Sequence, residues 1–246
     1  ASTHTDGADR PARHRAIPKP PNYAARRMLV GTAAVTLVFA AAVVGWRWFG
    51  GGDTSLGGER AAWTAIALVD RGTGDVTYVD ADGEVIDAGE WAIEAVATPG
   101  HSANHMAFAL TGTGILFSAD HVMAWATSIV APPDGAMADY MASLDKLIAR
   151  DETLYLPGHG GAVTKPRQFV RALKTHRKLR EAAILERLRK GDRTIPELVA
   201  EIYRDTDPRL HGAAGLSVLA HLEDLVTRGQ VSTDGPPAIN GRFALS

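Results

Sequence analysis

The chain has 246 residues, of which 46% are apolar and 22% charged, and this ordinary globular composition excludes wholesale disorder. Its 26 Lys and Arg nearly balance 28 Asp and Glu, and the net charge of −2 excludes a protein that coats nucleic acid by bulk charge. There is no cysteine, which excludes disulfides, thiolate zinc sites and cysteine nucleophiles. Any transition metal must therefore be bound by His, Asp or Glu, and nine histidines are available.

The N-terminal part begins with a basic tail, residues 1–27, which has little to bury and is predicted to be disordered. Residues 28–46 follow without a single charge. A helix of this length spans about 28 Å, close to the hydrocarbon thickness of a bilayer. We therefore predict a transmembrane helix over residues 28–48, which would make the membrane a partner of the chain. A buried core helix and a cleaved signal peptide are the alternatives.

The charges around this segment predict its orientation. Arg26 and Arg27 precede it, and an excess of positive charge keeps the N-terminal end of such a helix in the cytoplasm. The predicted localisation is a single-pass membrane protein with a cytoplasmic N-terminus. The alternative is a cytoplasmic protein, if the N-terminal segment does not belong to the domain. Residues 49–61, which are rich in glycine, are predicted to be a flexible linker.

From residue 62 the pattern changes to short strand-like runs separated by turns, which predicts a twisted antiparallel sheet. Residues 136–149 then have apolar positions at helical spacing, and a last run returns to strand. The strand-like runs are residues 64–69, 75–79, 90–98, 105–111, 114–118 and 153–157.

Beyond Pro166 the pattern is helical. Residues 166–193 hold ten basic and three acidic side chains, which indicates either the solvated face of an amphipathic helix or a nucleic-acid-binding surface. Thr194 marks the start of a second helix, and residues 213–228 form a third. Residues 230–246 are typical of a two-stranded ribbon, and three helices followed by a ribbon predict a winged helix.

Three polar side chains share one kind of setting. His101, Asp120 and His159 each follow a predicted strand and sit beside a small residue, where loops gather at one edge of a sheet. Two imidazoles and a carboxylate at such an edge suit a zinc or iron ion with open coordination positions. The sequence therefore predicts a metal site built from these three residues.

Four segments, TPGHSANH, FSADHVMAW, APPDGAMADYMASLDKLIARD and YLPGHG, resemble the later motifs of the metallo-β-lactamase-fold hydrolases. The resemblance is to the β-lactamase-like protein 2 type, which has a C-terminal winged helix. It implies an α+β chain with a partial metallo-β-lactamase-like αβ/βα sandwich over residues 62–165. A helical and winged-helix domain over residues 166–246 would follow it.

The resemblance also implies roles for individual residues. His101 would bind a first metal ion, Asp120 would bridge two ions, and His159 would bind the second, with one or two zinc ions in the family. Asp120 would in addition orient the attacking water and so act as the catalytic residue. His105 and His121 match no ligand position and are expected to support the ligands or the fold.

The sequence departs from the family at two points. The family's first motif, His-x-His-x-Asp-His, is not found, since only His4 and His14 precede His101. Ala119 stands where the family has a glycine before the bridging Asp. We therefore expect an impaired hydrolase that cleaves an ester, thioester or phosphodiester bond of a small molecule or RNA with metal-activated water. The alternative is an inactive remnant that binds nucleic acid or a protein through its winged helix.

Overall fold

The structure, a computed structural model, describes residues 66–69, 76–79, 81–88, 90–191 and 193–246. The predicted tail, transmembrane helix and linker, residues 1–61, lie outside the described residues. Among the helices that the structure does describe, none is long and apolar enough to cross a bilayer. The longest of them, Pro166–Lys190, carries charged side chains along its whole length.

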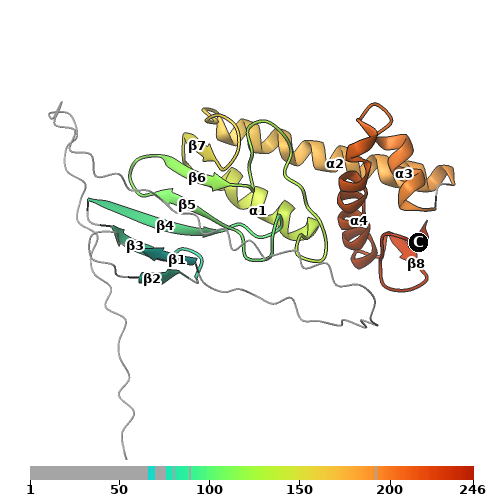
Figure 1. Ribbon diagram of the computed structural model, residues 1–246, viewed down its shortest axis with the longest axis horizontal. Helices are drawn as coiled ribbons and strands as arrows, with labels where there is room; N and C mark the ends of the chain where they lie inside the picture. Colours follow the sequence, from blue (N-terminus) through green and yellow to red (C-terminus); the bar gives the residue numbers. More distant parts are fainter. Residues whose placement is uncertain (1–65, 70–75, 80, 89, 192) are drawn as a thin grey trace, which may run out of the picture. The chain divides into compact units, whose positions relative to one another are not determined.

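A five-stranded sheet in the order β3-β4-β5-β6-β7 lies at the centre of the N-terminal part of the described chain (Figure 1). Strands β3 to β6 pair antiparallel, whereas β7 pairs parallel to β6. A separate hairpin is formed by two further strands. The strands are β1 (Ile66–Val69), β2 (Val76–Val79), β3 (Val85–Ala88), β4 (Trp91–Ala97), β5 (Met106–Leu110), β6 (Ile115–Ala119) and β7 (Leu154–Pro157).

The sheet differs from the predicted one in two ways. It is mixed rather than wholly antiparallel, because the connection between β6 and β7 contains helix α1 (Met137–Ala149), and such a crossover makes two strands parallel. Strand β3 was not predicted, because its four residues include Asp87 and are too few to show an alternating pattern. The mixed order has a consequence for function, since the C-terminal ends of parallel neighbours lie at one edge of the sheet.

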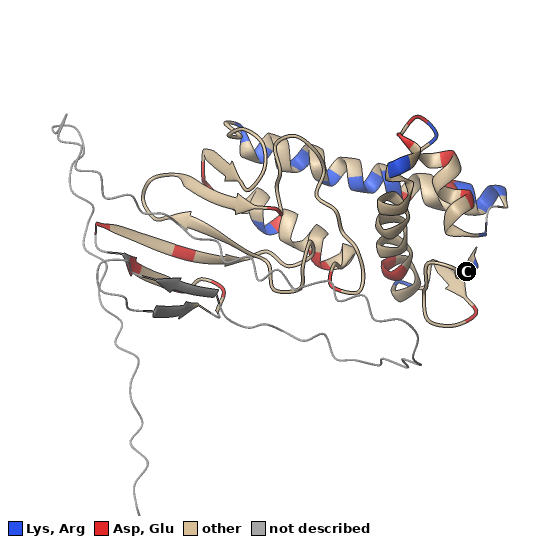
Figure 2. Ribbon diagram, in the orientation of Figure 1, with Lys and Arg blue, Asp and Glu red and all other residues tan. Residues whose placement is uncertain are grey.

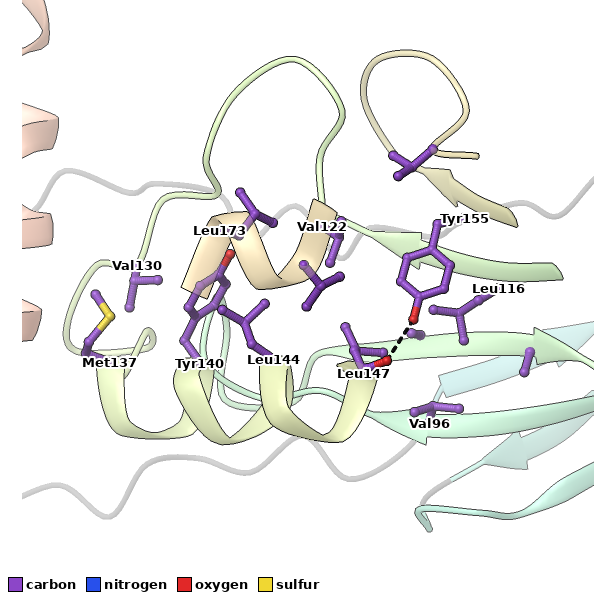
Figure 3. Close-up of a cluster of buried hydrophobic side chains, with 14 of the residues drawn as sticks. Val96, Leu116, Val122, Val130, Met137, Tyr140, Leu144, Leu147, Tyr155 and Leu173 are labelled. Atoms are coloured by element: carbon purple, nitrogen blue, oxygen red, sulfur yellow. Dashed lines mark hydrogen bonds between the residues drawn. The ribbon is translucent and has the colours of Figure 1, made fainter. Parts of the chain in front are cut away.

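One face of the sheet packs against α1 (Figure 3). Helix α1 places Tyr140, Leu144 and Leu147 at intervals of three and four residues, which is the spacing of one helix face, and all three are buried. Tyr155 of β7 is buried against them, and its hydroxyl donates to the Leu147 carbonyl oxygen at 3.2 Å. This packing holds β7 against α1.

The C-terminal part confirms the predicted three helices and ribbon. They are α2 (Pro166–Lys190), α3 (Ile195–Ile202), α4 (His211–Thr227), β8 (Val231–Thr233) and β9 (Phe243–Leu245), with a 3₁₀ turn at Pro208–Leu210. Thr194 caps α3 as predicted, since its side chain and that of Glu197 exchange hydrogen bonds with each other's backbone N–H groups. Strands β8 and β9 pair antiparallel, and their Val231 and Phe243 join the core of the three helices.

His221 on α4 is a packing residue, with 1% of its surface exposed. Burial, reinforced by the nearby Arg177 and Arg180, lowers its pKa to about 3 from its ordinary 6.5. The unfolded chain thus binds a proton here below pH 6.5 that the folded chain does not bind. Folding stability therefore falls as the pH drops from 6.5 towards 3, by up to about 1.4 kcal/mol per pH unit.

Replacing His221 by Leu is expected to remove this contribution. Urea unfolding at pH 7 and pH 4.5 should show a smaller loss of stability on acidification for His221→Leu than for the wild type, by about 2 kcal/mol or more. The variant should also be no less stable at pH 7, because both ring nitrogens of His221 are buried without a hydrogen-bond partner. The same pH dependence in both proteins would show that His221 does not stay neutral in the fold.

Candidate metal site

Two of the predicted ligands lie together at the edge where β6 and β7 end. Asp120 follows the last residue of β6, and His159 lies two residues beyond the end of β7. The His159 Nε2 atom is 3.6 Å from the Asp120 Oδ1 atom. Both side chains are accessible, with 61% of His159 and 37% of Asp120 exposed, so that a small ligand can reach them.

A glycine makes this approach possible. The Gly158 N–H donates to the Ala119 carbonyl oxygen at 2.9 Å and joins the two strand ends. A Cβ atom on Gly158 would lie 2.6 Å from Asp120 Oδ1, which is inside contact distance. A larger residue at this position would therefore displace the Asp120 carboxylate from its present place beside His159.

His101 lies in the loop after β4, and a backbone contact fixes its ring. Its Nδ1 atom is 2.6 Å from the Ile129 carbonyl oxygen. A carbonyl oxygen only accepts hydrogen bonds, so Nδ1 carries the proton of this bond and Nε2 is the ring nitrogen left to face a ligand. Histidines that bind metals commonly have this arrangement, with one ring nitrogen held by a carbonyl and the other facing the ion.

The structure does not bring all three predicted ligands into one group. In the part of the chain that it describes, no three His, Asp or Glu side chains are arranged to hold a single ion. The ligand roles of His101, Asp120 and His159 therefore stay predictions. The close Asp120–His159 pair and the orientation of His101 fit a divalent ion in their donor chemistry.

The two other histidines of these motifs lie further inside. Thr98 Oγ1 is 2.8 Å from His105 Nδ1, and burial, with His101 nearby, lowers the pKa of His105 to about 4. His121 is fully buried, and its ring centroid lies 5.6 Å from that of His105 and 4.4 Å from that of Tyr140. Burial likewise holds the pKa of His121 well below its usual range. Both rings are thus neutral and packed beneath the site, which is compatible with the supporting role expected of them.

Sequence reasoning missed the residues that hold the backbone of the site. Ser128 Oγ donates to the Asp120 carbonyl oxygen at 2.5 Å and to the His121 carbonyl oxygen at 2.9 Å. The Tyr140 hydroxyl donates to the same His121 oxygen at 3.1 Å. Hydroxyl side chains in a loop and on a helix have no sequence pattern that marks such a role, so only the fold reveals it.

Ala119, just before Asp120, has φ +43°, in the left-handed region that favours glycine. We expect Ala119→Gly to stabilise the protein by about 1 kcal/mol, because the strain of a Cβ in this conformation exceeds the extra chain entropy of glycine. Ala109→Gly, at a buried position inside β5, is the matched control and should destabilise by about 1 kcal/mol. Urea unfolding of both variants checks the two signs, and a loss of stability in Ala119→Gly would contradict the strain.

Comparisons with known protein families follow the same division of the chain. The metallo-β-lactamase superfamily model matches residues 44–159, and the β-lactamase-associated winged helix domain model matches residues 194–237. The chain thus carries a metallo-β-lactamase superfamily domain followed by a β-lactamase-associated winged helix, as its motifs predicted.

Individual relatives agree with this assignment. The β-lactamase-like protein 2 homolog of Caenorhabditis elegans is 31% identical over 163 residues, which are 66% of this chain and 54% of that protein. A metallo-β-lactamase family protein from Thermus thermophilus has a similar structure, with a TM-score of 0.58, 29% identity, and coverage of 68% of this chain and 53% of that one.

A third relative has a named activity. The atrochrysone carboxyl ACP thioesterase of Aspergillus fumigatus is 32% identical over 104 residues, which are 42% of this chain and 32% of that protein. The chain spans about half the length of the curated β-lactamase-like protein 2 homologs that it matches.

The family match also corrects the predicted localisation. It begins at residue 44, inside the predicted transmembrane helix 28–48, and it includes the whole predicted linker 49–61. The prediction rested on the length of the uncharged run 28–46, which is a criterion of composition alone. The last residues of that run fall within the metallo-β-lactamase superfamily match. The interpretation as a single-pass membrane protein is therefore wrong.

Proposed function

We propose that this protein is a metal-dependent hydrolase whose ion is held by Asp120 and His159, and that His101, which the structure leaves outside this pair, would have to move closer to become a third ligand. The observation that carries the proposal is the 3.6 Å approach of His159 Nε2 to Asp120 Oδ1 at the ends of two parallel strands. The metallo-β-lactamase superfamily match supports zinc or iron as the ion. When bound, such an ion polarises the scissile bond and lowers the pKa of water to near neutrality.

Each residue has a distinct part in this proposal. The Asp120 carboxylate would orient the attacking water and accept its proton, since it is partly open to solvent. His101 would present Nε2, because its Nδ1 is held by the Ile129 carbonyl oxygen. His101, Asp120 and His159 are fewer donors than the complete motif set supplies, so we expect a site built from these three to bind metal more weakly and turn over more slowly than a site with the complete set.

We propose a thioester as the substrate class, ahead of an ester or phosphodiester. The support is the named thioesterase of Aspergillus fumigatus among the relatives. The test is thiol release from acyl-N-acetylcysteamine thioesters by the full chain with zinc, manganese or iron(II), with bis-p-nitrophenyl phosphate as the phosphodiester arm. Thiol release that chelator removes and added metal restores is the expected result. No metal-dependent hydrolysis in either arm would contradict the proposal.

Binding of nucleic acid by the winged helix is the second proposal, and the structure favours it less. Figure 2 marks the positions of Lys and Arg in blue, and they recur along α2. At least five of the ten in residues 166–193 form ion pairs with carboxylates of the described part of the chain, which lowers the charge available to phosphates. They are Arg167, Lys174, Arg187, Arg189 and Lys190. Anisotropy of a labelled single-stranded RNA at rising salt tests this role, and no binding at low salt would exclude it.

A further inference from the structure

A buried arginine from α2 reaches the loop that carries the candidate site. Only 3% of the Arg177 surface is exposed, and its Nη2 donates a hydrogen bond to the Ser128 carbonyl oxygen. Its guanidinium carbon lies 5.1 Å from the centroid of the Tyr140 ring. Within the described part of the chain, no carboxylate forms an ion pair with Arg177. Burying a cation without a carboxylate is costly, so its contacts to Ser128 and Tyr140 are the compensation that the fold provides.

The two residues that Arg177 contacts, Ser128 and Tyr140, are also the two whose side chains donate hydrogen bonds to the backbone of Asp120 and His121. Ser128 Oγ donates to the carbonyl oxygens of Asp120 and His121, and the Tyr140 hydroxyl donates to that of His121. Arg177 therefore contacts both residues whose side chains donate to these two carbonyl oxygens. Ala119, which directly precedes Asp120, has a strained positive φ. Without the hydrogen bonds from Ser128 and Tyr140, we expect the backbone at Asp120 to shift so that this strain is relieved.

We propose that Arg177 is a positioning residue that acts through Ser128 and Tyr140 to hold the Asp120 carboxylate beside His159. The proposal rests on the proposed function, in which Asp120 and His159 share an ion. Arg177 belongs to α2, the first helix of the C-terminal part. The proposal therefore gives the C-terminal part a role in metal binding through Arg177, which does not itself bind the ion.

The test compares four forms of the full chain: wild type, Arg177→Met, Arg177→Lys and Arg171→Met. Met keeps the length of the side chain without its charge, Lys keeps the charge, and Arg171 is an exposed arginine on the same helix. The first readout, on metal-free protein, is the NMR signal of the Asp120 carboxyl carbon and of the His159 ring. The second is zinc affinity, measured by competition with a chromophoric chelator.

We expect both signals to shift in Arg177→Met, to return towards wild type in Arg177→Lys, and to stay unchanged in Arg171→Met. Zinc affinity should fall about tenfold in Arg177→Met, as it does when residues that orient metal ligands are removed. If Arg177→Met does not fold, Ser128→Ala cuts the same link at its other end and should shift the same signals. Unshifted signals in the folded variant, or wild-type zinc affinity in Arg177→Met, would overturn the proposal.

The outcomes separate this proposal from the proposed function. A wild type that binds no zinc contradicts the metal site alone, and a signal shift in Arg177→Met would still show that Arg177 positions Asp120. A wild type that binds zinc, together with an Arg177→Met variant that binds it equally well, contradicts only the positioning role.

Discussion

Asp120→Ala is expected to reduce metal-dependent thioester hydrolysis by about 10³-fold, the largest loss from any single substitution at the site. The carboxylate has two proposed tasks, binding the ion and orienting water, and it lies 3.6 Å from the His159 imidazole with which it would share that ion. Its removal should therefore lower both the bound metal and the rate. Thiol release and metal content, measured on the same preparation, check the two effects together.

Asp151→Ala is the matched control. The Asp151 side chain is 99% exposed and pairs with Arg167 at 3.2 Å on the protein surface, so its loss should leave rate and metal content unchanged. Both variants remove one carboxylate from a loop position, which makes the charge change equal. Hydrolysis in Asp120→Ala at the wild-type rate would show that the observed activity does not depend on this site.

Gly100→Ala is expected to have the largest effect on stability, a loss of about 4 kcal/mol or more that leaves little folded protein. Gly100 precedes His101, has φ +129°, and lies so close to α1 that a Cβ would be 2.3 Å from both the Cα and the N atom of Tyr140. Backbone atoms cannot rotate away as the end of a side chain can. The helix or the loop must shift, and both are needed for the site.

Gly112→Ala separates the clash from the cost of the conformation. Gly112 also has a positive φ, +78°, but a Cβ there would meet nothing within 4 Å. We expect a loss of about 1 to 2 kcal/mol, from the left-handed conformation alone. Thermal and urea unfolding of both variants measure the difference, and equal losses would show that the contact with Tyr140 does not matter.

Local patterns were enough to predict much of the fold. The apolar spacing of 136–149 predicted α1, and the Thr194 helix start, the helical pattern of 213–228 and the ribbon pattern of 230–246 predicted the order of the winged helix. These elements depend on neighbours a few residues apart, which the sequence shows directly. The placement of Asp120 and His159 beyond strand ends was predictable for the same reason, and their mutual approach followed once β6 and β7 proved to be parallel.

Long-range contacts were not predictable. Arg177 and Ser128 are 49 residues apart, and neither has a pattern that links it to the other. An arginine at this position of an amphipathic helix is indistinguishable in sequence from its solvated neighbours, because burial depends on what packs against it. The left-handed φ of Ala119 was not predictable either. The sequence shows that alanine replaces the family's glycine, but it does not show the backbone conformation at that position.

The most direct test of the account is the metal content of the full chain after dialysis against a weak chelator, measured by mass spectrometry. If Asp120, His159 and His101 hold an ion, the wild type should retain about one equivalent of zinc or iron per chain. Asp120→Ala should lose most of that metal, and Asp151→Ala should keep it. Less than about 0.2 equivalents in the wild type would contradict the metal-dependent mechanism.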